Sequence, residues 1–155
     1  MKYYIGEYWA MMNTSDIKTR EEGVKKWDET AKEYGDYFQS IRDKLPKKFT
    51  REFDNNCWFH DFTFDSINVS KIEKRTSTIE LIITHDTNSF KITLSGVTSF
   101  TFNIPSTRCW LCGKLTWGYN EFELSDDGMW IIRILCDIES ELEILFKRIS
   151  IEKLK

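Results

Sequence analysis

The chain has 155 residues, of which 41% are hydrophobic and 15% aromatic, so it is long and apolar enough to build a core and is not a disordered sequence. Lys and Arg number 22 against 25 Asp and Glu, and the formal charge of −3 excludes any strong attraction to nucleic acid phosphates. We expect one domain over residues 1–155, with a helical part over 1–56 and a sheet part over 57–155.

The sequence offers nothing that would place it in a membrane. No window approaches 18 uninterrupted apolar residues, and the first residues lack the apolar core of a signal peptide. We therefore expect a cytoplasmic protein without membrane contact. In that compartment Cys57, Cys109, Cys112 and Cys136 are expected to be thiols or metal ligands rather than disulfides.

The first part of the chain is predicted to be helical. Residues 3–12 are apolar at mixed spacing and favour a short helix over a strand. A long helix is predicted between Thr19 and Pro46, because apolar residues recur there at alternating spacings of three and four. This apolar stripe consists of Val24, Trp27, Ala31, Tyr34, Phe38, Ile41 and Leu45. The capping-box spacing of Thr19 and Glu22 predicts where the helix begins, and Pro46 predicts its end.

Two glycines lie inside the predicted long helix. Gly23 and Gly35 each cost about 1 kcal/mol relative to alanine, so packing has to stabilise the helix. Its stripe is therefore expected to lie on a sheet of the same chain rather than form a dimer seam, and we expect a monomer. A second short helix is predicted around Phe49 and Phe53, which lie four residues apart.

After Cys57 the period of the hydrophobic pattern changes from 3.6 to 2, which predicts half-buried strands. Three such strands are centred on Phe62 and Phe64, on Ile79, Leu81 and Ile83, and on Phe90, Ile92 and Leu94. Residues 85–88 form turns readily, so the second and third strands should pair as a hairpin. Gly96 interrupts the alternation and predicts a bulge before Phe100 and Phe102.

The last third of the chain continues the strand pattern. A strand with Phe122 and Leu124 leads into a predicted turn over residues 125–128, and the apolar run 129–136 is expected to be a central strand covered on both faces. A closing strand is predicted from Leu142, Ile144 and Phe146, with Ile149 and Ile151 after a register shift at residues 147–148. The elements together predict an α+β fold, with a long N-terminal helix and one or two short helices packed on an antiparallel sheet of about six strands.

Two cysteine spacings suit a metal site. Cys109 and Cys112 form a Cys-x2-Cys motif followed by Gly113, which is half of a zinc site, and Cys57-x2-His60 has the ligand types and spacing of a second half. Residues three apart on a regular strand face opposite ways, so Cys57 and His60 can converge only from a turn. Separate reduced thiols are the favoured interpretation, and zinc held by these four residues is the alternative.

No catalytic residues are expected. The two histidines, His60 and His85, are each followed by an aspartate, but the sequence has no third histidine to complete a phosphohydrolase metal site. It also lacks a nucleophile elbow, a glycine-rich phosphate loop and a dinucleotide fingerprint. We expect His60 at the start of a strand with its ring hydrogen-bonded, and Asp86 as part of a turn.

Residues 121–143 carry most of the candidate site. Eight carboxylates lie in this segment against the single cation Arg133, and four of them recur at every second residue, which would place them on one face of a strand. The eight are Glu121, Glu123, Asp126, Asp127, Asp137, Glu139, Glu141 and Glu143. They are either a solvated sheet face or a docking surface for a basic protein, whose association a field of one sign would orient.

Several short patterns point to one family. These are an apolar-faced N-terminal helix closing in Leu45-Pro46, His60-Asp61 at the first strand, Gly96-Val97 after the strand of Phe90, Ile92 and Leu94, and the closing run 141–144. With them the chain resembles a bacterial family of small α+β domains of unknown function, in the style of the immunity proteins encoded beside toxins. The resemblance implies a cytosolic, non-catalytic protein and carries no functional residues with it.

The sequence thus predicts a function in binding. We expect a non-catalytic protein that binds another protein, in the form of an immunity protein that covers a basic toxin with the acidic segment. The alternative is a zinc-stabilised domain or a metal-dependent enzyme that uses Cys57, His60, Cys109 and Cys112.

Overall fold

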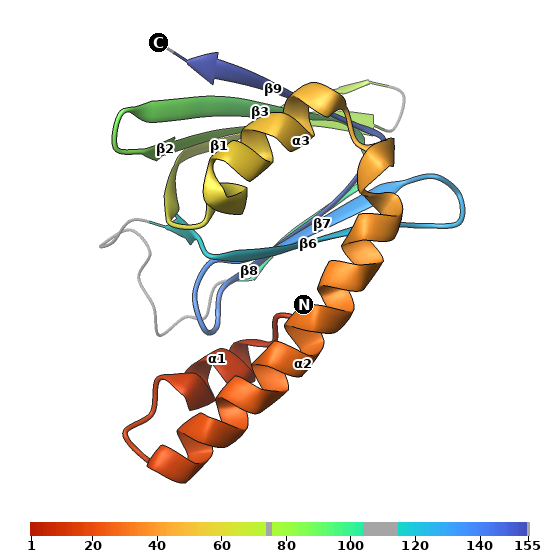
Figure 1. Ribbon diagram of the computed structural model, residues 1–155. Coiled ribbons are helices and arrows are strands. Elements are labelled where there is room, and N and C mark those ends of the chain that lie inside the picture. Colours follow the sequence, from red (N-terminus) through yellow and green to blue (C-terminus); the bar gives the residue numbers. More distant parts are fainter. Residues whose placement is uncertain (74–75, 104–114, 155) are drawn as a thin grey trace.

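The structure, a computed structural model, describes residues 1–73, 76–103 and 115–154. The helices occupy the first third of the chain, as predicted (Figure 1). They are α1 (Gly6–Met12), α2 (Ile17–Ile41), the 3-10 turn Arg42–Lys44, α3 (Lys47–Asn55) and a second 3-10 turn, Cys57–Phe59. The short helices predicted over residues 3–12 and around Phe49 and Phe53 are thereby confirmed. None of the helices in the described ranges is both long and apolar enough to cross a membrane.

The strands form two antiparallel sheets rather than one. They are β1 (Phe62–Glu73), β2 (Thr76–His85), β3 (Asn88–Val97), β4 (Ser99–Asn103), β5 (Thr116–Trp117), β6 (Tyr119–Leu124), β7 (Trp130–Leu135), β8 (Glu141–Phe146) and β9 (Arg148–Leu154). One sheet has the order β5-β1-β2-β3-β9 and the other the order β4-β8-β7-β6. The α+β class is confirmed, as is the β2–β3 hairpin, in which Ile83 pairs with Phe90.

A shared corner divides the strands into two sheets. β3 pairs with β9 in the larger sheet, and their continuations β4 and β8 pair in the smaller one. Gly96 has a φ of +71°, and a Cβ there would lie 2.9 Å from the Cβ of Lys147. The bulge predicted at Gly96 and the shift predicted at residues 147–148 are thus the two sides of one corner, where strands pass from sheet to sheet.

The long helix begins earlier than predicted. α2 starts at Ile17, and the Oδ2 of Asp16 accepts a hydrogen bond of 2.8 Å from the backbone N–H of Thr19. Asp16 is therefore the N-cap, and the capping box expected from Thr19 and Glu22 is not formed. Thr19 stands at the third position of the first turn, where its N–H is one of the donors that the cap satisfies.

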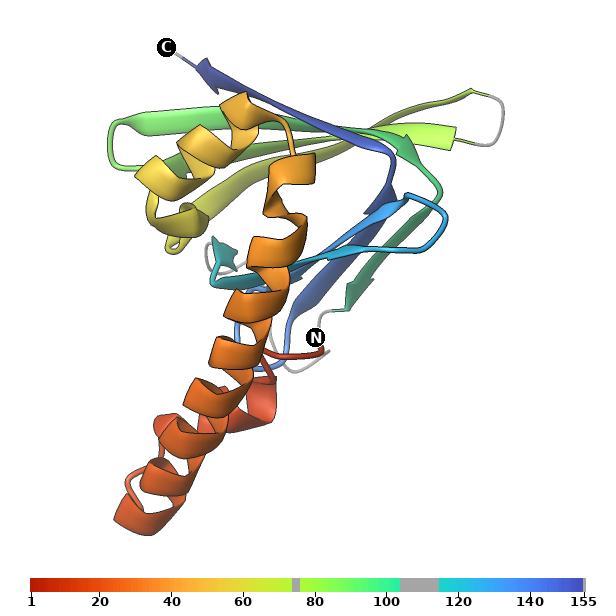
Figure 2. The same cartoon turned by 45° about the vertical axis from the view of Figure 1, so that its right-hand side comes forward.

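α2 lies on a sheet from Trp27 onward, where the rings of Trp27 and Tyr119 on β6 have centroids 4.5 Å apart. The turns before Trp27 extend past the sheets, and α1 lies along them (Figure 2). A Cβ on Gly23 would lie 2.6 Å from the Cβ of Met11, so this glycine lets the two helices approach closely. Val24 was predicted in the apolar stripe, but it is 42% exposed. Here α1 packs on the helix face that carries Gly23 and leaves the adjacent face, with Val24, open to solvent.

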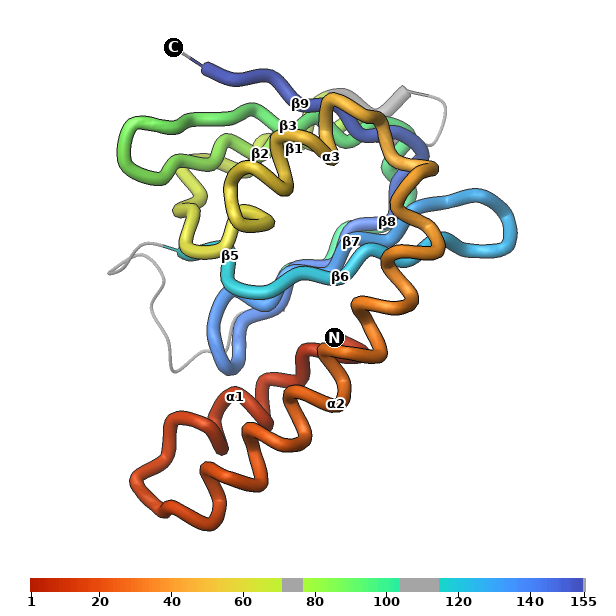
Figure 3. The backbone as a smooth tube through the Cα atoms, in the orientation of Figure 1, coloured from red at the N-terminus to blue at the C-terminus, as the bar shows by residue number. Residues whose placement is uncertain are grey.

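An aromatic cluster holds the helices to both sheets. Phe53 on α3 lies edge-on to Phe122 on β6 and to Phe38 on α2, with ring centroids 5.7 and 6.1 Å apart. Phe49 and Phe59 complete the cluster, and all but Phe38, at 3%, are at most 1% exposed. Figure 3 shows the backbone of α3, the end of α2 and the two sheets arranged around one interior region.

Strand β7 lies in the middle of its sheet, between β6 and β8, as predicted. Its inner face, with Trp130, Ile132 and Ile134, is buried. Its outer face carries the half-buried Ile131 and Arg133, so the full cover expected on both faces is wrong. An arginine in the run accounts for this, because its guanidinium needs acidic partners on an open sheet face.

Candidate functional site

The eight carboxylates of the acidic segment are dispersed over the smaller sheet. Asp126 and Asp127 lie in the β6–β7 turn, whereas Asp137 and Glu139 lie in the β7–β8 loop at the opposite end of β7 (Figure 1). The remaining four lie on the outer faces of β6 and β8: they are Glu121, Glu123, Glu141 and Glu143. The one-face arrangement predicted from their spacing holds for Glu141 and Glu143 only, because the chain turns before β8 begins.

Glu121 is a structural residue. It is 1% exposed, and its carboxylate accepts hydrogen bonds from the backbone N–H groups of Lys2, Tyr3 and Tyr4 at 2.6 to 3.1 Å. A buried carboxylate requires such donors. Glu121 therefore fastens the N-terminus to β6 and is not available to a partner.

Three more carboxylates have internal partners. Arg133 donates from Nε to Glu143 at 2.6 Å and from Nη1 to Glu123 at 2.8 Å, so it bridges β6 and β8 across β7. Burial lowers the pKa of this guanidinium, but the two carboxylates outweigh that effect and hold the pKa above its usual value. Glu141 contacts the α-amino group of Met1. Glu123, Glu141 and Glu143 keep part of their surface exposed and can still attract a cation.

The turn carboxylates also have local roles. Asp127 accepts from the hydroxyl of Ser125, which lowers the pKa of its carboxyl, and it caps the β6–β7 turn. Asp137 accepts from the backbone N–H groups of Glu139 and Ser140 at 2.8 and 2.7 Å. Asp126 and Glu139 are exposed. Most of the acidic segment thus serves the scaffold, and its exposed carboxylate surface is divided between the two ends of the sheet and its outer face.

A second candidate site lies at the turn that joins α3 to β1. Cys57, Trp58 and Phe59 have φ values of +49°, +58° and +61°, and Asp61 has +69°. Left-handed backbone costs roughly 1–2 kcal/mol for each non-glycine residue, and three such residues in succession are uncommon. Packing holds the turn in place: Phe59 is fully buried, and the buried Asn120 donates from Nδ2 to the carbonyl of Trp58 at 3.0 Å.

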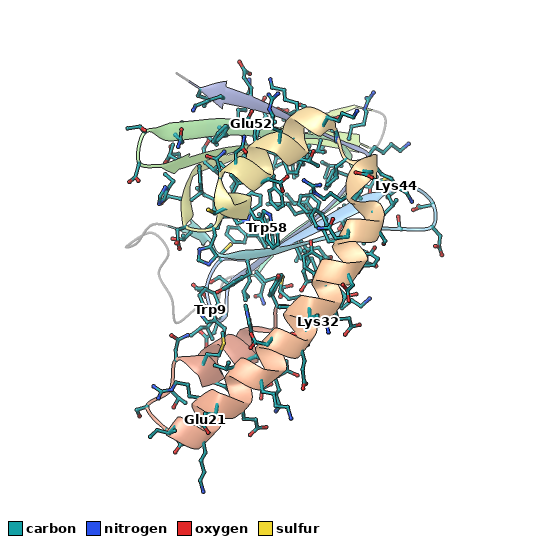
Figure 4. All side chains as sticks on the ribbon, in the orientation of Figure 1. Trp9, Glu21, Lys32, Lys44, Glu52 and Trp58 are labelled. Atoms are coloured by element: carbon teal, nitrogen blue, oxygen red, sulfur yellow. The ribbon has the colours of Figure 1, made fainter. Side chains whose placement is uncertain are left out.

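The turn presents its side chains around a small pocket. The cavity has a volume of about 110 Å³ and is lined by Tyr4, Cys57, Trp58, His60, Gly118, Tyr119 and Asn120. Trp58 is 43% exposed and stacks on Phe53, with ring planes 7° apart. Figure 4 shows Trp58 beneath α3 and Trp9 between α1 and the smaller sheet. The pocket therefore lies where the N-terminal segment, the left-handed turn and the start of β6 meet.

Burial and nearby carboxylates raise the pKa values of the two tyrosine hydroxyl groups in the pocket. Burial, and then the charge of Glu121, raise the pKa of Tyr4 to about 12. Burial and the charge of Asp61 also raise the pKa of Tyr119. The Nδ1 of His60 lies 2.9 Å from Oδ2 of Asp61, and its ring centroid lies 4.9 Å from that of Tyr119. The local potential is therefore negative around an aromatic surface.

The predicted metal ligands are brought together in part. Cys57 and His60 line one pocket because a turn carries them, as their spacing required. Cys109 and Cys112 lie outside the described residues, and Cys136 is buried with its pKa raised to about 12 by desolvation. Within the described ranges no three His, Cys, Asp or Glu side chains are grouped so that they could hold a metal ion.

His60 precedes β1 instead of starting it, which corrects its predicted place in a strand. His85 is the last residue of β2, and Asp86 lies in the turn between β2 and β3 with a φ of +52°, in agreement with its predicted turn role. Sequence patterns did not indicate Trp58, Tyr119 or Asn120 as site residues. No glycine marks the left-handed turn that assembles them, so the usual signal for positive φ is missing.

Comparison of the chain with models of known protein families gives no match, and comparison with curated proteins gives none either. The likeness to immunity-type proteins stays an expectation based on short sequence patterns.

Proposed function

We propose that this is a non-catalytic protein that acts by binding another protein. The observation that carries the proposal is Trp58, a large aromatic side chain that is 43% exposed on a left-handed turn. Tryptophan is enriched among the residues that dominate binding energy at protein interfaces. Backbone strain of this kind persists where the surrounding structure enforces it, and such strain clusters at functional positions.

The rigidity of the turn favours recognition of a protein. Phe53 supports one face of the Trp58 ring, and Asn120 holds the Trp58 carbonyl, so the indole loses little conformational freedom when a partner covers it. The adjoining pocket of about 110 Å³ is much smaller than the 300–1,000 Å³ typical of small-molecule sites. A surface of this shape suits one protruding side chain of a larger partner.

The partner that we propose is basic. Asp61 beside the turn and Glu139 in the β7–β8 loop are exposed, and Glu141 and Glu143 retain exposed surface on the outer sheet face. These carboxylates would attract and orient a positively charged protein. In its specific form the proposal is an immunity function in the cytoplasm, in which a monomer of this protein covers the basic active site of a toxin.

The test is co-expression of the tagged chain with the product of the neighbouring coding region, together with capture from native lysate. We expect one basic partner that is released by salt, because screening weakens exposed charge pairs. Trp58→Ala should weaken capture by tenfold or more. Phe100→Ala is the matched control, since Phe100 is a 38% exposed aromatic residue on β4. A chain that binds no protein, or equal capture by Trp58→Ala and the wild type, would contradict the proposal.

A further inference from the structure

We propose that the pocket beside Trp58 is a receptor for one cationic side-chain head group, the guanidinium of an arginine or the ammonium of a lysine. The inference rests on the proposed function, because the head group would belong to the basic protein partner. It adds a specific contact to a general attraction between opposite charges. The lining residues all lie outside the acidic segment 121–143, and Glu121 touches the site only by accepting a hydrogen bond from the backbone N–H of Tyr4.

The first argument is the aromatic lining. Three of the seven lining residues, Tyr4, Trp58 and Tyr119, are aromatic. The rings of Tyr4 and Tyr119 stack on each other with centroids 5.2 Å apart, and the 43% exposed indole of Trp58 is the ring open to a cation. Cations bind to the faces of such rings, most strongly to that of tryptophan. None of the seven lining residues is a lysine or an arginine, so the pocket holds no permanent cation that would repel one.

The second argument is charge. Asp61 follows the left-handed turn with its side chain 67% exposed, and its charge acts on the phenol of Tyr119. Glu121 acts in the same way on Tyr4. A cation in the pocket therefore lies close to two carboxylate charges, and an anion is disfavoured for the same reason.

The third argument is size. The cavity of about 110 Å³ is well below the 300–1,000 Å³ typical of small-molecule sites. A guanidinium has only four heavy atoms. The occupant that suits this size is the end of a side chain whose stem reaches in from outside. The indole of Trp58 at the edge provides an apolar surface for such a stem.

The experiment uses N-acetyl-arginine methylamide as the probe and its citrulline counterpart, which has the same shape without the charge, as the control ligand. Each is titrated into the isotope-labelled full chain while the indole N–H signal of Trp58 and the backbone amide signals of Gly118 and Tyr119 are followed by NMR. We expect saturable shifts at these positions with the arginine probe and at least fivefold weaker binding of the citrulline probe.

Two variants locate the contact. Asp61→Asn should weaken arginine binding about threefold to fivefold, whereas Asp86→Asn should leave it unchanged. The pair is matched, because Asp86 also follows a histidine and also has a positive φ, but it lies at the β2–β3 turn. As an independent readout, the arginine probe should slow alkylation of the exposed Cys57, mapped by mass spectrometry, and citrulline should not.

The outcomes separate this inference from the proposed function. Equal binding of arginine and citrulline, equal effects of the Asp61 and Asp86 substitutions, or the absence of saturable shifts at the pocket would each overturn the receptor. Capture of a protein partner that depends on Trp58 would still support the binding function in that case. If the arginine probe does not bind at the pocket and no protein partner is captured, the receptor and the binding function are both refuted.

Discussion

The hydroxyl of Tyr34 on α2 accepts a hydrogen bond of 2.7 Å from the backbone N–H of Phe122 on β6. One helical turn later, the hydroxyl of Tyr37 accepts one of 3.1 Å from the N–H of Leu124. β6 is the last strand of its sheet, and these two N–H groups point away from β7. The helix thus closes the edge of the sheet with side-chain oxygens, where an open edge would invite pairing with another chain.

Removing the Tyr34 hydroxyl should destabilise the protein. Tyr34→Phe leaves the N–H of Phe122 without its acceptor in a buried place, since Tyr34 is only 2% exposed. We expect a loss of about 1–3 kcal/mol in the free energy of unfolding, measured by urea titration. Tyr37→Phe is the control and should lose less, because water can reach this half-buried position. Equal losses in the two variants would show that the edge contact is not the cause.

Replacing Glu121 should weaken the attachment of the N-terminal segment. Glutamine has one carbonyl oxygen for the N–H donors of residues 2–4, and its own NH₂ group would face them. We expect Glu121→Gln to lower the free energy of unfolding by about 2–3 kcal/mol, seen as a lower midpoint of thermal unfolding. Glu123→Gln, on the same strand with 33% side-chain exposure, should change it by less than about 1 kcal/mol. A smaller effect at Glu121 than at Glu123 would rule out this role.

Stability should fall in alkaline solution. The pKa of Cys136 is raised from 9.0 to about 12, and those of Tyr4 and Tyr34 are raised from 10.0, in each case chiefly by burial. Above the unfolded pKa the unfolded chain releases these protons while the folded chain keeps them, so the unfolded state binds fewer protons and the free energy of unfolding decreases.

The decrease should begin near pH 9 and steepen above pH 10, as followed by urea unfolding at a series of pH values. Cys136→Val, which has no proton to lose, should move the onset to about pH 10. An unchanged onset in this variant would mean that Cys136 does not contribute.

Glycine in the left-handed turn should stabilise the fold. Cys57 is exposed and has a φ of +49°, so Cys57→Gly relieves a strained backbone without opening a cavity. We expect a gain of about 0.5–1 kcal/mol, after the extra entropy of glycine in the unfolded chain is subtracted. Gln39→Gly, at an exposed position of α2, should instead lose about 1 kcal/mol. Chemical denaturation measures both, and a loss at Cys57 would mean that the turn is not strained.

Local patterns predicted the parts of the fold that depend on nearby residues. The four-residue spacing of Phe49 and Phe53 predicted α3. The alternation of apolar residues predicted the hairpin in which Ile83 pairs with Phe90. The division into two sheets was not predictable in this way, because Gly96 signals a bulge but does not say that the chain changes sheets there. The close approach of Gly96 to Lys147 is a contact between residues 51 positions apart in the sequence.

The candidate site was less predictable than the fold. Composition indicated eight acidic residues but not their internal partners, since Glu121 binds the backbone of residues more than 100 positions away. The turn Cys57–Phe59 contains no glycine, so its residue types did not predict a left-handed backbone. A carboxylate that holds the scaffold and one that meets a partner have the same signature in a sequence, and only their surroundings distinguish them.

The corner at Gly96 and Lys147 ties the two sheets into one cooperative unit. Because β3 continues into β4 and β8 into β9, and both pairs remain hydrogen-bonded on either side of the bend, neither layer can detach without breaking the ladder of the other. Amide hydrogens in β3 and β8 should therefore exchange with solvent through the same global opening and at the same free energy.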